Sequence, residues 1–187
     1  MLDRTWLLAL SVLVVTAVVL RLLRHPRVGA LFVEYIPDWR KRRLFLAAVS
    51  FLVTLAVARS LAYANFHDIG PFHDIYIRGR HIHHLVWGIL LLLTVGYASL
   101  LGAGDENAPK SVWTSRLLAL LYGAGAALTL DEFALWLNLE DVYWSPEGGA
   151  SIDAVMLFGA VLLVGIWGRP FFAAIAREML HLVRRKN

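Results

Sequence analysis

Five of the seven histidines lie in one short segment, FHDIGPFHDIYIRGRHIHHL at residues 66–85. The segment separates two long apolar runs, and it also contains two aspartates, Asp68 and Asp74. So many imidazoles beside apolar segments suit metal coordination or proton transfer better than simple solvation. We therefore take the five as candidate metal ligands: His67, His73, His81, His83 and His84.

The last three of these histidines stand where the next apolar run begins. On a helix, His81 and His84 would share a face, whereas in an extended segment His81 and His83 would point the same way. Either geometry gives an imidazole pair, to which His67 or His73 adds a third ligand. Without thiolates such a site predicts a divalent transition metal, with zinc first and iron, copper or manganese as alternatives.

A second polar group appears in LDEFALWLNLED, residues 130–141. Asp131 and Glu132 fall inside an apolar run, where an ionised carboxylate needs a partner in the protein interior. On one continuous helix Glu132 and Glu140 would share a face. This row predicts Glu132 as a catalytic carboxylate, with Asp131 beside it, and Glu140 as a further metal ligand.

Arg59 is the expected counter-charge for these acids, because it lies at a similar depth in its own apolar run. We predict an ion pair between Arg59 and Asp131 that joins two helices. The catalytic alternative is that Arg59 stabilises negative charge on a substrate. In the connection that follows, Tyr143 is expected at the membrane interface, and Ser151 is expected to cap the next helix.

The composition indicates that membrane spans carry these residues. The 187 residues are 59% hydrophobic and 17% charged, with a mean hydropathy of +0.63, which is too little polar surface for a water-facing globule. The apolar residues come in blocks near the roughly 20 residues that cross a hydrocarbon core. The chain has no cysteine, which excludes disulfides and thiolate metal sites.

We predict an all-α fold, a polytopic membrane bundle of about five transmembrane helices that forms one integral membrane domain over residues 1–187. The predicted spans are residues 5–23, 44–64, 84–101, 116–139 and 152–167. Residues 170–187 are predicted to form an amphipathic helix, and residues 29–39 a short interfacial helix that ends at Pro37. The small residues of LYGAGAAL, residues 121–128, predict a close helix contact within the bundle or in a dimer.

The basic residues orient this bundle. Fourteen of the 18 fall on one side of the five-span arrangement, in the connections after the first and third spans and in the C-terminal segment. That side is predicted to be cytoplasmic, with the N-terminus outside and the C-terminus inside the plasma membrane of a bacterium. The candidate site then faces outside. Basic residues placed at span ends are orientation signals, which argues against nucleic acid as a partner.

These features predict an integral membrane metalloprotein with a His/Asp/Glu site near the outer face. Its most specific form is a metal-dependent hydrolase of a lipid-like substrate, in which the metal activates a water and a carboxylate serves as general base. One alternative is a non-enzymatic membrane subunit or scaffold, in a homo-oligomer or bound to a partner subunit. The other is a small transporter that moves a cation or protons through the acidic and histidine-rich vestibule.

Overall fold

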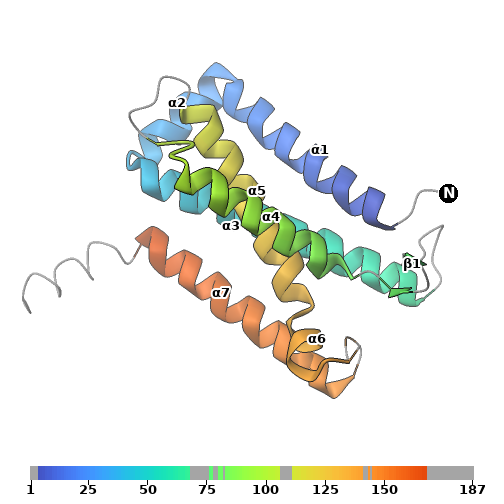
Figure 1. Ribbon diagram of the computed structural model, residues 1–187. Coiled ribbons are helices and arrows are strands. Elements are labelled where there is room, and N and C mark those ends of the chain that lie inside the picture. The colour runs from blue at the N-terminus through green and yellow to red at the C-terminus, as the bar shows by residue number, and fades with distance from the viewer. Residues whose placement is uncertain are drawn as a thin grey trace, which may run out of the picture.

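The computed structural model describes residues 4–67, 76–77, 80–81, 83–105, 111–140, 143 and 145–167. Nearly all of them are helical, which confirms the all-α prediction (Figure 1). The β-structure in these ranges is one short antiparallel ladder between β1 (Tyr76–Ile77) and β2 (Arg80–His81). The predicted C-terminal amphipathic helix, residues 170–187, lies outside the described residues.

Five long helices correspond to the five predicted spans. They are α1 (Arg4–Arg24), α3 (Trp39–Phe66), α4 (His84–Leu100), α5 (Ser111–Asp131) and α7 (Gly149–Trp167). Among the described helices, α3 alone is both long and apolar enough to cross a membrane, judged by length and composition, while α4 and Gly149–Leu163 are shorter apolar helices. The count of five spans therefore stays a prediction.

The shorter elements are α2 (Pro26–Tyr35), α6 (Phe133–Asn138) and a 3₁₀ turn (Pro146–Gly148). Helix α2 is the predicted short helix before Pro37, and it begins with Pro26 in its first turn, where a missing N–H costs nothing. Helix α3 begins after Asp38, whose side chain accepts hydrogen bonds from the backbone N–H groups of Arg40 and Lys41 at 2.8 and 3.4 Å.

Helices α3, α4 and α5 form the centre of the molecule, with α1 and α7 on opposite sides of them (Figure 1). Helix α5 packs against both α3 and α4, and α7 packs against α3 and α6. The core between α3, α5 and α7 includes Phe51, Ala127 and Leu162, all nearly inaccessible to solvent.

The predicted fourth span, residues 116–139, is not one continuous helix. Helix α5 ends at Asp131, Glu132 has φ −110° and ψ 27°, and α6 begins at Phe133. The backbone N–H of Ala134 donates to Ser151 Oγ at 2.8 Å, so a side chain of α7 satisfies an amide beside the break. Because the helix breaks, Glu132 and Glu140 no longer share one helical face, and Glu140 lies exposed beyond α6.

The small residues of α5 form contacts inside the bundle, which confirms the first of the two predicted options. A Cβ added to Gly123 would overlap the carbonyl oxygen of Ala47 on α3. On α4, a Cβ added to Gly88 would lie 2.8 Å from the carbonyl oxygen of Gly125. The backbone of α5 therefore approaches both neighbours to distances that only glycine permits.

Replacing Gly123 by alanine should destabilise the protein by about 1–3 kcal/mol, because α3 and α5 must move apart to admit the methyl group. The measurement is thermal or denaturant unfolding in detergent. Gly159→Ala on α7 is the matched control, since a Cβ there meets nothing within 4 Å. The control should be neutral or slightly stabilising, because alanine favours helix by about 1 kcal/mol. Equal effects of the two substitutions would contradict the close contact.

Candidate functional site

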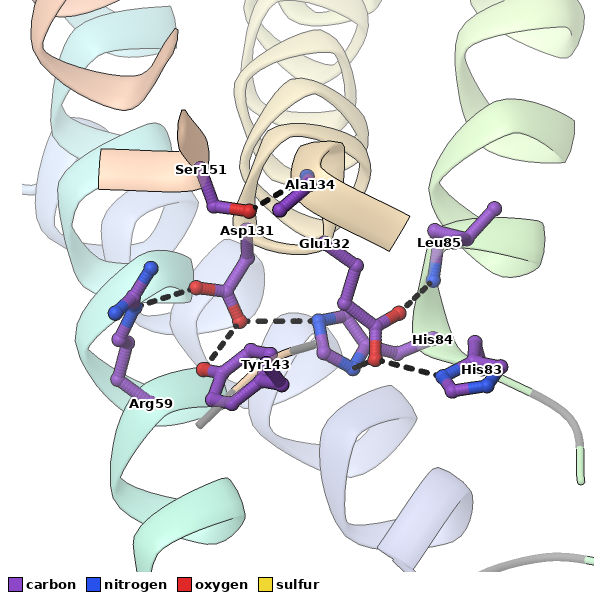
Figure 2. A network of polar contacts seen from close by, with 9 residues as sticks. All are labelled: Arg59, His83, His84, Leu85, Asp131, Glu132, Ala134, Tyr143 and Ser151. Carbon is purple, nitrogen blue, oxygen red and sulfur yellow. Dashed lines mark hydrogen bonds and ion pairs between the residues drawn. The ribbon is translucent and has the colours of Figure 1, made fainter. Parts of the chain in front are cut away.

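A cluster of ionisable side chains lies where the second half of α3, the start of α4 and the end of α5 meet (Figure 2). Its members come from four parts of the chain: Arg59, His83, His84, Asp131, Glu132 and Tyr143. We call this set the polar network. Five of its six members are residues that the sequence predicts for the site, and Tyr143 is the addition.

Asp131 is the most deeply buried member, with no exposed surface. Its Oδ1 accepts a hydrogen bond from Arg59 Nε at 2.5 Å, which confirms the predicted ion pair. Its Oδ2 lies 3.1 Å from His84 Nε2 and accepts a hydrogen bond from the Tyr143 hydroxyl at 3.0 Å. Three partners from different segments therefore compensate the burial of one carboxylate.

Glu132 binds the start of α4. Its Oε2 accepts the backbone N–H of Leu85 at 2.9 Å, which is one of the amides at a helix N-terminus that has no partner within the helix. Its Oε1 lies 3.1 Å from His83 Nδ1 and 3.2 Å from His84 Nδ1. The carboxylate thus caps α4 from the break between α5 and α6, and it contacts two imidazoles.

His84 connects the two acids, because its ring lies between them (Figure 2). Nε2 contacts Asp131 and Nδ1 contacts Glu132, and the imidazole is almost fully buried. Asp131 and Glu132 are neighbours in sequence, and both of their side chains contact the imidazole of His84.

The two ends of the network reach the surface. The side chain of Arg59 is 36% exposed and that of His83 is 19% exposed, while the three members between them are buried. The Arg59 guanidinium also lies over the Tyr143 ring, 5.3 Å from its centroid. The result is a continuous row of polar groups that passes through the protein interior between two accessible ends.

The remaining predicted ligands lie elsewhere or outside the described residues. His67 is exposed at the end of α3, where its ring packs 4.2 Å from Tyr63 and 5.2 Å from Phe66 between ring centroids. Glu140 is exposed. His73 lies outside the described residues, as does the side chain of His81, whose backbone belongs to β2.

Within the part of the chain that the structure describes, no group of three or more His, Asp or Glu side chains is arranged to hold a metal ion. The imidazoles and carboxylates there contact one another instead. Comparisons of the chain with protein-family models, with curated proteins and with solved structures gave no match.

For two residues of the site, Ser151 and Tyr143, the sequence predicts roles other than those the structure shows. Ser151 is predicted to cap its own helix, and that prediction is wrong, because α7 begins at Gly149 and Ser151 lies within its first turn, where its hydroxyl accepts the Ala134 N–H of α6. Tyr143 was expected only at the membrane interface, yet its hydroxyl reaches Asp131. No local sequence pattern marks Tyr143 for this role, because its contact with Asp131 joins residues on either side of α6.

Asp131→Asn should lower the free energy of unfolding by about 3 kcal/mol, because it removes the charge that compensates Arg59 and weakens three contacts at once. Unfolding of detergent-solubilised protein measures the loss. Glu140→Gln is the matched control, since it makes the same acid-to-amide change on an exposed side chain. It should change stability by less than about 0.5 kcal/mol. An Asp131→Asn protein as stable as the control would show that the network does not hold the helices together.

Proposed function

We propose that this chain is an integral membrane protein that performs acid–base chemistry at His84 on an amphipathic, lipid-like substrate. One observation carries the proposal, namely the position of the His84 ring between two buried carboxylates. Nε2 lies 3.1 Å from Asp131 and Nδ1 lies 3.2 Å from Glu132. A histidine held in this way can accept a proton and return it without changing its position.

The number of protons in this arrangement follows from the chemistry of the groups. An ionised carboxylate only accepts hydrogen bonds, and a neutral imidazole has a single N–H to donate. The hydrogen bond between His84 Nε2 and Asp131 therefore requires one proton. The ion-pair contact of Nδ1 with Glu132 is attractive only when a second proton lies on Nδ1 or on the carboxyl group. Either His84 is an imidazolium between two carboxylates, or it is neutral beside one carboxylic acid. The two forms differ only in which atom carries one proton, so transfer between them needs little rearrangement.

A purely structural lock would be satisfied by Arg59 and Asp131 alone. Here the row continues through His84 and Glu132 to His83, whose side chain is partly exposed. His83 therefore offers a route by which protons from solvent reach the buried imidazole. This extension favours acid–base chemistry over the scaffold alternative.

A cavity of about 620 Å³ between α1, α4 and α5 supports the choice of substrate. Most of its walls are apolar, with Leu13, Leu91 and Leu121 as examples from the three helices. Of the described residues that line it, His84 is the only one with an ionisable side chain. An apolar chain that occupies this cavity would bring an attached polar group to the imidazole.

The exterior of the bundle supports a membrane location. Large apolar side chains are exposed on several helices, among them Leu13 on α1, Leu93 on α4 and Leu157 on α7. Such surfaces are costly in water and suited to lipid. The orientation we propose puts the polar network at the outer face, because the basic residues cluster near the opposite end of α3.

A divalent metal is the second candidate, favoured by the contacts of Glu132. The Nδ1 atoms of His83 and His84 both approach its Oε1, and Asp131 contacts the other ring nitrogen of His84. A carboxylate behind a metal-bound histidine is the usual way to orient such a ligand. To bind zinc there, the imidazoles would have to turn away from their present hydrogen bonds. Alternatively, a further histidine such as His73 or His81 would have to supply a ligand.

Nitrogen NMR of ¹⁵N-histidine-labelled protein in micelles tests the shared protons. In the unchanged protein both ring nitrogens of His84 should show protonated or exchange-averaged shifts, with assignment by His84→Gln. Glu132→Gln should leave a proton on Nε2 alone, because the amide of the new side chain can donate to Nδ1. His67→Gln is the control and should leave the His84 signals unchanged. His84 shifts that are identical in the unchanged and Glu132→Gln proteins would refute the proposal.

Elemental analysis of the same samples distinguishes the two candidates. Acid–base chemistry without a metal predicts substoichiometric zinc, iron, copper and manganese in protein purified without a histidine tag. Near-stoichiometric metal that is lost in a His83→Ala/His84→Ala double variant would instead favour the metal candidate, since the loss would trace the ion to these imidazoles.

The substrate class is tested by photolabelling with a diazirine fatty acid. We expect labelled peptides from the cavity walls, and Thr16→Trp should reduce this labelling at least about threefold by filling the cavity. Labelling at Leu157 on the exposed face of α7 reports surrounding lipid and should not change. If Thr16→Trp reduces neither signal, or both equally, the cavity does not bind the apolar chain.

A further inference from the structure

A second cavity, of about 160 Å³, lies at the other end of the bundle between the start of α3, the turn after α4 and the start of α5. Three arginines line it: Arg42 and Arg43 from α3 and Arg116 from α5. Arg43 and Arg59 are 16 residues apart on α3, so this cavity is roughly 24 Å from the polar network along the helix. We call it the arginine cavity.

The arginine cavity concentrates positive charge. No aspartate or glutamate is among the described residues that line it. Three described acids belong to adjacent segments, but Glu34 on α2 is exposed, Asp38 caps α3 and Asp105 follows the turn, and none of them forms part of the walls. Arg42 and Arg116 are close enough to repel each other. Like charges brought together around a cavity are favourable only when an anion balances them.

The arginines are also held in place by neutral partners. Arg42 donates to the carbonyl oxygen of Pro37 at 3.1 Å. The guanidinium of Arg43 lies over Trp39, and that of Arg116 lies 4.7 Å from the centroid of Trp113. These contacts fix the planar groups without neutralising them, which leaves them able to bind a phosphate through paired N–H donors.

The backbone adds to the positive potential. The walls include the first turns of α3 and α5, where the helix dipole places partial positive charge. Gly104, with φ +81°, brings the turn after α4 against Ser115, and a Cβ there would lie 2.9 Å from Ser115 Cα. A glycine is therefore needed to close this wall of the cavity.

An apolar groove adjoins the arginine cavity at Arg43 and is lined by α3, α4 and α5. Its volume is about 680 Å³, and Arg43 lines both spaces. Beyond Arg40 and Arg43 its walls are mainly apolar, with Leu44 on α3, Val95 on α4 and Leu118 on α5. A molecule that fits both spaces has an anionic end and a long apolar chain.

We propose that these two spaces bind one anionic phospholipid, with its phosphate among Arg42, Arg43 and Arg116 and an acyl chain in the groove. Charge complementarity selects the phosphate, and the groove selects a lipid over free phosphate. The site is independent of the acid–base chemistry at His84. By the proposed orientation it would face the cytoplasmic leaflet, whose surface is negatively charged.

Native mass spectrometry of the full chain in detergent tests this site by titration with phosphatidylglycerol and, separately, with phosphatidylcholine. One phosphatidylglycerol should bind at least about tenfold more tightly than phosphatidylcholine. Arg43→Gln/Arg116→Gln should abolish that preference. Arg27→Gln is the matched control, because it removes an exposed arginine that lines neither space, and it should keep the preference.

A steric variant tests the acyl chain separately. Gly96 lines the groove, and a Cβ there meets nothing within 4 Å, so Gly96→Phe should fill the groove while the protein keeps its melting temperature. It should weaken phosphatidylglycerol binding about tenfold or more, whereas inorganic phosphate should compete poorly with the lipid. Equal affinity for the two lipids, or equal loss in Arg27→Gln, would overturn the site. If inorganic phosphate competes effectively and Gly96→Phe has no effect, the site binds phosphate, and the proposal that it binds a lipid is refuted.

Discussion

The burial of the Asp131 carboxylate is the constraint on which the rest of the site depends. A fully buried charge is tolerated only when partners replace the lost water, and Asp131 has three of them. Arg59 comes from α3, His84 from α4 and Tyr143 from the connection before α7. To satisfy one side chain, the chain must therefore bring the ends of three helices and a loop to the same point.

The helix break after Asp131 lies beside this carboxylate and adds further contacts between segments. With α5 ended there, Glu132 reaches the Leu85 amide in the first turn of α4, and the amide of Ala134 is satisfied by Ser151 on α7. Each of these bonds joins segments distant in sequence. The end of α5 and the starts of α4 and α6 are thus stabilised by side chains of other segments. The imidazole of His84 is held in place by the same contacts.

The two ends of the bundle differ in chemistry because the middle is apolar and closely packed. Glycines at the α3–α5 and α4–α5 contacts bring the backbones together, and the polar side chains buried near them are small and uncharged, such as Ser50 and Thr129. At one end acids and imidazoles exchange protons in the proposed function. At the other end arginines without a lining carboxylate face a groove that suits a lipid chain.

The sequence by itself determined the helical class, the approximate helix positions, that the small residues of α5 pack closely against another helix, and the pairing of Arg59 with Asp131. Each depends on local periodicity, on residue size or on the cost of burying one charge, and these can be read from a single segment. Only the tertiary structure decided that α5 breaks at Glu132, that Ser151 and Tyr143 serve the site, and that His83 and His84 contact the acids while His67 does not. Those outcomes depend on hydrogen bonds between residues far apart in the chain, which no local pattern specifies.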